Sequence, residues 1–236
     1  MSKIINESHD GWDRNSSGKK WEDMDTITCP DGQVIDMQKL LDDQQRAKAA
    51  LVHLQPFFGA FINRLRPVYT FRVETQAVDG VNIFINPQFT YNLDLTGKVF
   101  VLAHEIMHCV LSHLRRSKLL GHDMRRANVA GDYEINVSLT DTFGLFKPQT
   151  VKNLNGLYDN KYKDWGYEKI YDSNPPDPSR DDMNNKDQSK QAEQNQQSDG
   201  SSGSGGGGSN NKQYSEDYKK GWNQAMEDYK KGKLKI

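Results

Sequence analysis

The chain has 236 residues, of which 35% are hydrophobic and 27% are charged, and its formal net charge at pH 7 is -1. This near balance of charges gives no overall attraction to nucleic acid or to a membrane surface, and the first ten residues lack the apolar segment of a signal peptide. Because no run approaches the roughly 20 apolar residues of a membrane span and the two cysteines do not form a disulfide framework, we expect a cytoplasmic protein that binds no membrane.

Residues 1–36 are polar and are predicted to be an N-terminal extension in which Trp12 and Trp21 are the large apolar anchors. Within this extension, Thr26–Thr28 and Gln33–Ile35 flank a Pro-Asp-Gly turn sequence. Short β-prone stretches on either side of such a turn indicate a weak hairpin.

Helical spacing of apolar residues begins after Asp36, which is a suitable N-cap residue, and continues to Pro56. A second helical piece is predicted from Phe57 to Leu65, because Pro67 cannot continue a helix. The predicted domain therefore begins at residue 37.

Two β-rich stretches follow, Val68–Thr75 and Asn82–Asn86, with the turn dipeptide Asp79-Gly80 between them. They predict a hairpin whose second strand ends before Pro87. An open edge of this hairpin would suit binding of an extended peptide, although the hairpin could simply cover the next helix.

The stretch Val99–Arg116 carries the motif on which the functional argument depends. It contains His104-Glu105-Ile106-Met107-His108, which fits the pattern H-E-x-x-H, inside an apolar surface wide enough for a buried helix. On a helix, two histidines four residues apart lie about 40° apart around the axis, so both imidazoles can reach one metal ion. Glu105 is then placed to act on a metal-bound water as a general base. The alternative is a pair of structural histidines with Glu105 as a cap.

A catalytic zinc ion usually has three protein ligands and one open position, so the motif needs a third ligand. On a continuous helix that begins at the N-cap Thr96, His113 would lie about 180° from His104 and about 140° from His108. It is therefore not expected to share their ion.

The helix predicted over Ala127–Leu139 offers the better source of a third ligand. It carries Asp132, which lies 24 residues after His108 and so leaves room for an antiparallel return, and Glu134, which points about 200° away from Asp132. We favour Asp132 as the ligand and keep Glu134 as the alternative. Asn136 shares the face of Asp132 and is predicted to hold a ligating histidine through a hydrogen bond.

The C-terminal part of the chain changes composition. Trp165–Tyr171 is predicted to be a closing helix, which ends the domain at about residue 172. Residues 173–213 are rich in Pro, Asn, Gln, Ser and Gly and are predicted to be a disordered linker. Residues 214–236 are predicted to be a short helical tail that docks on a protein partner, or else a solvated end.

These motifs resemble the metallopeptidase domain of the VWA-like predicted zinc peptidases of bacteria and phages. The resemblance rests on His104-Glu105-x-x-His108, on Asn128-Val-Ala-Gly-Asp132-Tyr-Glu-Ile-Asn136, and on Gly166–Tyr171. It covers about residues 37–172. Gly131 stands where a small or thiol residue is common, and the VWA-like C-terminal domain that often follows is expected to be lacking here.

The resemblance implies a zincin-like α+β fold, with the active helix packed beside a small sheet or hairpin and a second ligand-bearing helix. It also implies zinc on His104, His108 and Asp132, with Glu105 as the base of a zinc-dependent peptidase that acts on protein or peptide substrates. Such a protein is expected to be bacterial or phage-encoded and to act in the cytoplasm of the cell. Three residues are candidates for an additional oxyanion donor: Tyr133, His122 and Arg126.

Two other functions compete with the peptidase. One is a non-catalytic binding module that is stabilised by metal and holds a partner through the hairpin edge and the tail. The other is an SprT-like protease that acts on nucleic-acid-bound proteins. The intact Glu105 argues against the first alternative. The second lacks a zinc ribbon and offers a weak basic patch, so binding to nucleic acid is not expected. This patch comprises Arg115, Arg116, Lys118, Arg125 and Arg126.

Overall fold

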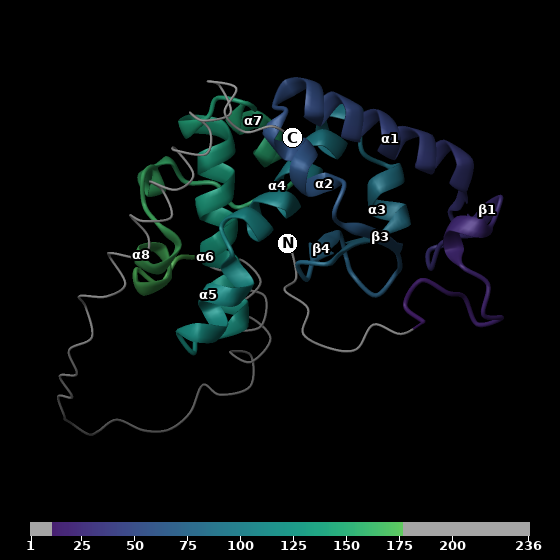
Figure 1. Ribbon diagram of the computed structural model, residues 1–236, viewed down its shortest axis with the longest axis horizontal. Helices are drawn as coiled ribbons and strands as arrows, with labels where there is room; N and C mark the ends of the chain where they lie inside the picture. The colour runs from purple at the N-terminus through teal and green to yellow at the C-terminus, as the bar shows by residue number, and fades with distance from the viewer. Residues whose placement is uncertain (1–10, 177–236) are drawn as a thin grey trace, which may run out of the picture.

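The computed structural model describes residues 11–176 (Figure 1). These residues form a mixed α+β fold with two small sheets, which confirms the predicted fold class. The predicted linker and helical tail lie outside the described residues. In chain order the elements are η1 (Trp21–Asp23), β1 (Thr26–Thr28), β2 (Val34–Asp36), α1 (Met37–Leu54), α2 (Phe57–Ile62), β3 (Arg66–Tyr69), β4 (Gln76–Val78), β5 (Asn82–Ile85), α3 (Pro87–Tyr91), α4 (Leu95–Val110), α5 (His113–Leu119), α6 (Met124–Val137), the π-helical η2 (Ser138–Thr142), α7 (Pro148–Asn153), η3 (Asn160–Tyr162) and α8 (Tyr167–Asp172).

The predicted N-terminal hairpin is present and contributes to the main core. β1 and β2 pair antiparallel with Ile27 opposite Ile35, and both side chains are buried. The two tryptophans of this segment also pack on the domain, because Trp12 contacts the ring of Phe84 and Trp21 contacts that of Phe71.

Helix α1 begins where the sequence predicts, since the Asp36 side chain accepts a hydrogen bond from the Lys39 amide at 2.9 Å. It crosses the top of the molecule above α4 in Figure 1 and is in contact with it. An ion pair joins the two helices, because the Lys98 ammonium of α4 donates to the Asp43 carboxylate of α1 at 3.2 Å. The same ammonium also donates to the Leu93 carbonyl at 2.6 Å. This pair fixes the active helix against its neighbour.

The three-stranded sheet differs from the predicted hairpin. The strand order is β3-β5-β4, with β3 parallel to β5 and β4 antiparallel to it across the Asp79-Gly80 turn. The predicted first strand, Val68–Thr75, is therefore wrong, because the chain leaves the sheet after Tyr69 and returns only at Gln76. β5 becomes the central strand, so the edge nearest α4 belongs to β4, which packs against that helix.

The predicted continuous helix over Val99–Arg116 is broken in two. Helix α4 starts after Asp94, whose carboxylate accepts from the Gly97 amide at 2.7 Å, so Asp94 and not Thr96 is the N-cap. The helix ends at Val110, and Ser112 adopts the left-handed conformation with φ of 55° before α5 begins. This bend redirects every side chain that follows.

The stretch Leu95–Leu119 is, contrary to the expectation from the sequence, long and apolar enough to cross a membrane by length and composition. However, 72% of its most apolar window is buried inside the protein. Its first part, α4, serves as the central helix of the main core.

Apolar side chains gather in two larger cores that meet along α4 and α6. The main core contains α1, α2 and α4, and Ile135 of α6 also belongs to it. The second core lies between α6 and the chain around α8, and it includes Val129, Tyr133, Tyr162 and Tyr167. Helix α6 therefore presents one face to each core.

Candidate metal centre

Three side chains converge at the seam between α4 and α6. His104 Nε2 and His108 Nε2 lie 3.1 Å apart, and Asp132 Oδ1 lies 3.2 Å from the first and 3.1 Å from the second. All three side chains are buried. A tetrahedral shell with bonds of about 2.0 Å separates its donor atoms by about 3.3 Å. The three atoms thus form a nearly equilateral triangle of the size that one zinc ion requires.

The outer nitrogen of His104 is held by Asn136, as the sequence predicts. Its Nδ1 lies 2.8 Å from Asn136 Oδ1, and the Asn136 amide nitrogen donates to the Leu157 carbonyl at 2.8 Å. Since that second bond fixes which way the amide faces, His104 must donate through Nδ1. Its Nε2 lone pair then points into the triangle.

The outer nitrogen of His108 is held by a second histidine. His108 Nδ1 lies 3.0 Å from His113 Nδ1, and His113 Nε2 lies 2.9 Å from Glu134 Oε2. The carboxylate can only accept, so a neutral His113 carries its proton on Nε2 and accepts at Nδ1. His108 then donates through Nδ1 and keeps its Nε2 lone pair for an ion. We refer to these three residues as the relay.

The placement of His113 differs in part from the expectation. As predicted, it lies outside the triangle of His104, His108 and Asp132. However, it contacts His108 directly, which a continuous helix would not permit. The left-handed conformation of Ser112 accounts for the difference. Glu134, the alternative third ligand, lies behind His113 and contacts the ring nitrogen farther from the triangle.

The relay is enclosed tightly on both sides. Gly131 lies so close that a Cβ placed there would be 2.7 Å from His113 Nδ1. Tyr167 covers the other side, with its ring centroid 5.2 Å from that of His113. Arg116 stacks over Tyr167, bonds both carboxylate oxygens of Glu168, and lies 3.8 Å from Glu134. Helices α5, α6 and α8 thus jointly position His113.

Electrostatics favour the metal-binding forms of Asp132, His108 and His113, whereas the raised pKa of His104 favours its protonated form, from which a metal ion would have to displace the proton. Burial alone would raise the pKa of the Asp132 carboxyl, but the hydrogen bonds and charges of the two histidines hold it well below its ordinary value. Burial would likewise lower the pKa of His104, yet the hydrogen bond and charge of Asp132 raise it overall. Burial lowers the pKa of both His108 and His113, which favours their neutral forms. A charged carboxylate and neutral imidazoles are the metal-binding states.

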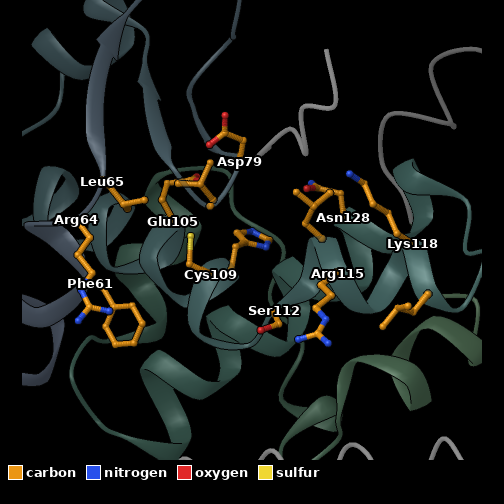
Figure 2. A pocket seen from close by; sticks show the side chains of 15 residues that line it. Phe61, Arg64, Leu65, Asp79, Glu105, Cys109, Ser112, Arg115, Lys118 and Asn128 are labelled. Carbon is orange, nitrogen blue, oxygen red and sulfur yellow. The ribbon is translucent and has the colours of Figure 1, made fainter. Parts of the chain in front are cut away.

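Two cavities meet at Glu105, which is buried on α4 beside the triangle. The larger has a volume of about 650 Å³ and also contacts His108, whereas the smaller, of about 60 Å³, contacts His104 and Asp132. Figure 2 shows the larger cavity, with Glu105 among the side chains that line it. The general-base candidate therefore faces the space in which a substrate would lie.

Asn128 is a functional candidate that the sequence reasoning did not single out, and it also lines the larger cavity. Its amide nitrogen donates to Asp132 Oδ2 at 3.3 Å, which leaves Oδ1 directed to the two histidines. Its position one helical turn before Asp132 was the signal that could have identified it.

The three predicted oxyanion donors lie elsewhere. Tyr133 packs on Tyr162 in the second core, and His122 stacks on Tyr171 with ring centroids 3.7 Å apart. Arg126 donates to the Tyr171 carbonyl. Among the residues that the structure describes, none of the three lines either cavity.

The model of a protein family described as a "putative metallopeptidase domain" matches residues 40–233, which is most of the chain. The match extends past α8 and through the predicted linker into the tail. No curated protein and no solved structure matches the chain.

Proposed function

This chain belongs to the putative metallopeptidase domain family, and on that premise we propose that it is a zinc-dependent peptidase with Glu105 as its general base. The family supports a peptidase that acts on protein or peptide substrates through a divalent metal. The zinc ion, the H-E-x-x-H mechanism and the roles of individual residues are our proposal.

The observation that carries this proposal is the triangle of donor atoms. His104, His108 and Asp132 supply two imidazoles and one carboxylate with their lone pairs directed to one point. When bound there, zinc would lower the pKa of a coordinated water and polarise the substrate carbonyl. The same donor set also suits iron(II), so the identity of the metal has to be measured.

Glu105 supplies the proton transfer that peptide hydrolysis needs. As the residue next to His104, it lies at the junction of the two cavities, within the wall that a bound peptide would touch. Its carboxylate would take a proton from the attacking water and pass it to the leaving amine. A purely structural metal site has no need of such a group.

Strand β4 and the turn after it border the larger cavity. The Asp79 amide bonds the Asn82 carbonyl, and the Asn86 amide bonds the Thr75 carbonyl, so Thr75, Ala77 and Asp79 face β5. The backbone N–H and C=O groups of successive residues point to opposite edges of a strand. Those of Gln76 and Val78 therefore point away from β5. Gln76 and Val78 are buried, so this edge is covered, and the chain here reaches the larger cavity through Val78 and Asp79.

The nucleic-acid alternative loses part of its basic patch. Arg116 is buried against Glu168, and Arg126 is engaged by Tyr171 through its carbonyl and its ring. The binding-module alternative depends largely on the tail, which lies outside the described residues. The binding-module alternative gives no reason for Glu105 to face both cavities, whereas an SprT-like protease would use Glu105 in the same way and differs in its need for a basic surface.

The test is metal content and peptide hydrolysis of purified wild type, Glu105→Gln, Asp132→Ala and Glu74→Gln, which changes an exposed glutamate as a control. We expect one zinc in the wild type, Glu105→Gln and the control, and less in Asp132→Ala. Hydrolysis should fall about a hundredfold or more in Glu105→Gln, as loss of a general base predicts. Absence of bound metal after loading, or undiminished hydrolysis by Glu105→Gln, would overturn the proposal.

A further inference from the structure

The larger cavity combines an apolar wall with cationic groups. Figure 2 shows Phe61, Arg64 and Leu65 on one side and Arg115 and Lys118 on the α5 side. Apolar side chains of β4 and α5 complete the wall, namely Val78, Leu114 and Leu119. The volume of about 650 Å³ lies within the range of small-ligand pockets and exceeds one side chain.

Three cationic side chains, Arg64, Arg115 and Lys118, line this cavity together with two carboxylates, which leaves a formal excess of one positive charge. The other carboxylate that lines it besides Glu105 is Asp79, and its oxygens accept from the amides of Val81 and Asn82 and from the Asn82 side chain. That carboxylate is committed to its own turn. Within residues 11–176, neither Arg64 nor Arg115 forms an ion pair, and both are exposed.

A buried acceptor is also present in the wall. Asn128 is 8% exposed, and its Oδ1 has no hydrogen-bond partner within the part of the chain that the structure describes. An unsatisfied buried carbonyl is unfavourable, so a ligand that supplies an N–H donor would stabilise this site. A peptide backbone supplies such a donor.

We infer that this cavity is the specificity pocket of the proposed peptidase and that it selects peptides in which an apolar residue is flanked by acidic residues. The apolar side chain enters the cavity, a backbone N–H of the peptide donates to Asn128, and the acidic groups lie against Arg64 and Arg115. The inference rests on the proposed function for its substrate, but the charge preference is a property of the pocket. It can therefore be measured by binding alone.

The experiment measures peptide affinity for zinc-loaded Glu105→Gln protein by fluorescence anisotropy with an uncharged dye. Three peptides share a central leucine and differ in their flanking residues, which are glutamate, glutamine or lysine. The glutamate peptide should bind about tenfold more tightly than the glutamine peptide, with the lysine peptide weakest, since each exposed charge pair contributes a few-fold. Added salt should remove this difference.

Charge reversals assign the preference to the pocket. Arg64→Glu and Arg115→Glu, each in the Glu105→Gln background, should weaken the glutamate peptide about threefold to tenfold and leave the glutamine peptide unchanged. Arg66→Glu is the matched control, because Arg66 is exposed two residues from Arg64 and does not line the cavity. Equal affinity for all three peptides, or an equal effect of Arg66→Glu, would overturn the inference.

Two further measurements separate the possible failures. Wild-type hydrolysis of the glutamine and glutamate peptides at equal rates would leave the peptidase standing and overturn the inference. Tight binding of the glutamate peptide without any hydrolysis would support the pocket and count against the peptidase. Displacement of that peptide by a single-stranded oligonucleotide at lower concentration would assign the cationic groups to nucleic acid instead.

Discussion

Glu134 is linked to the proposed metal ligand His108 through His113. Its carboxylate requires a proton on His113 Nε2, and that proton leaves His113 Nδ1 as the acceptor for His108. The tautomer of His108, a proposed metal ligand, is thus set by a carboxylate that lies outside the triangle. Outer partners of this kind commonly change metal affinity by about tenfold to a hundredfold.

We therefore predict that Glu134→Gln binds zinc about tenfold more weakly than wild type, because a neutral amide holds the proton of His113 less firmly. Competition with a chromophoric chelator measures the affinity, and Glu74→Gln serves as the control. Unchanged affinity would show that the relay has no influence. Loss of zinc as complete as in Asp132→Ala would instead make Glu134 a ligand.

Gly131 supports the relay by having no side chain. Alanine in a helix is favoured over glycine by about 1 kcal/mol, so propensity alone predicts that Gly131→Ala stabilises the protein. The added Cβ would, however, lie 2.7 Å from His113 Nδ1, and that ring is confined by His108 and Tyr167. Overpacking of this kind costs typically 1–3 kcal/mol.

The steric effect should prevail. We expect Gly131→Ala to lower the free energy of unfolding by about 1–2 kcal/mol and to weaken zinc binding. Denaturant unfolding measures the first effect and chelator competition the second. Gly59→Ala is the control, because its Cβ would meet Val52 at an ordinary 3.4 Å and should leave stability equal or higher. Equal behaviour of the two variants would contradict this account.

At the level of single residues, the sequence predicted the members of the triangle but not the contact of His113 and Glu134 with His108. Helix geometry was sufficient to pair His104 with His108, but it left the third member between Asp132 and Glu134, and the structure brings Asp132 to the two histidines. The relay could not be predicted, because it depends on the left-handed conformation of Ser112. Neither glycine nor proline marks that bend in the sequence.

Among the elements, α1 and α4 are tied by the Asp43–Lys98 pair. The Lys98 side chain is 4% exposed and that of Asp43 is 18% exposed, so removing the carboxylate leaves a buried ammonium with one carbonyl partner. We predict that Asp43→Asn lowers the free energy of unfolding by about 1–3 kcal/mol. Asp42→Asn, which changes an exposed neighbour on the same helix, is the control.

This contribution should depend on pH with a definite sign. The hydrogen bond from Lys39, followed by that from Lys98, lowers the pKa of the Asp43 carboxyl below its ordinary value. The stabilisation is fully present above that ordinary value, near pH 4, and is lost as pH falls through the lowered one. Urea unfolding of wild type and Asp43→Asn should thus differ at neutral pH and converge in acid. A constant difference across this range would contradict the assignment.

The sheet illustrates why element boundaries were only partly predictable. Val68–Thr75 has a β-prone composition, yet only its first two residues lie in β3, and Asn86 holds the following bend through the Val73 carbonyl. The strand that precedes the Asp79-Gly80 turn is Gln76–Val78, whose composition gives a weak signal but whose three residues are all buried. Tertiary burial decided the assignment, and the parallel pairing of β3 with β5 has no local signature.

On the scale of the whole molecule, the three proposed metal ligands stand on helices of both cores. His104 and His108 stand on a helix of the main core, whereas the helix that carries Asp132 also forms one wall of the second core. An ion bound by all three would cross-link the two cores. Binding to the folded state alone stabilises it in proportion to ligand excess, by about 2.7 kcal/mol at a hundredfold excess over the dissociation constant.

Removal of the metal should therefore lower the melting temperature of wild type by about 5–10 °C. Calorimetry with and without a chelator measures the shift. Asp132→Ala lacks the carboxylate ligand from α6 and should melt at the same temperature with and without the chelator. An unshifted wild type would indicate that the ion contributes nothing to holding the cores together.

The bend at Ser112 has a consequence for how the motif is used to compare proteins. A chain with the same letters and a straight helix would carry His113 on the far side, and its His108 would need a different hydrogen-bond partner. Two proteins with an identical pattern could then retain their ion for very different times. The conformation of the residue that follows the helix, Ser112 in this chain, would distinguish such proteins, whereas the H-E-x-x-H motif itself would not.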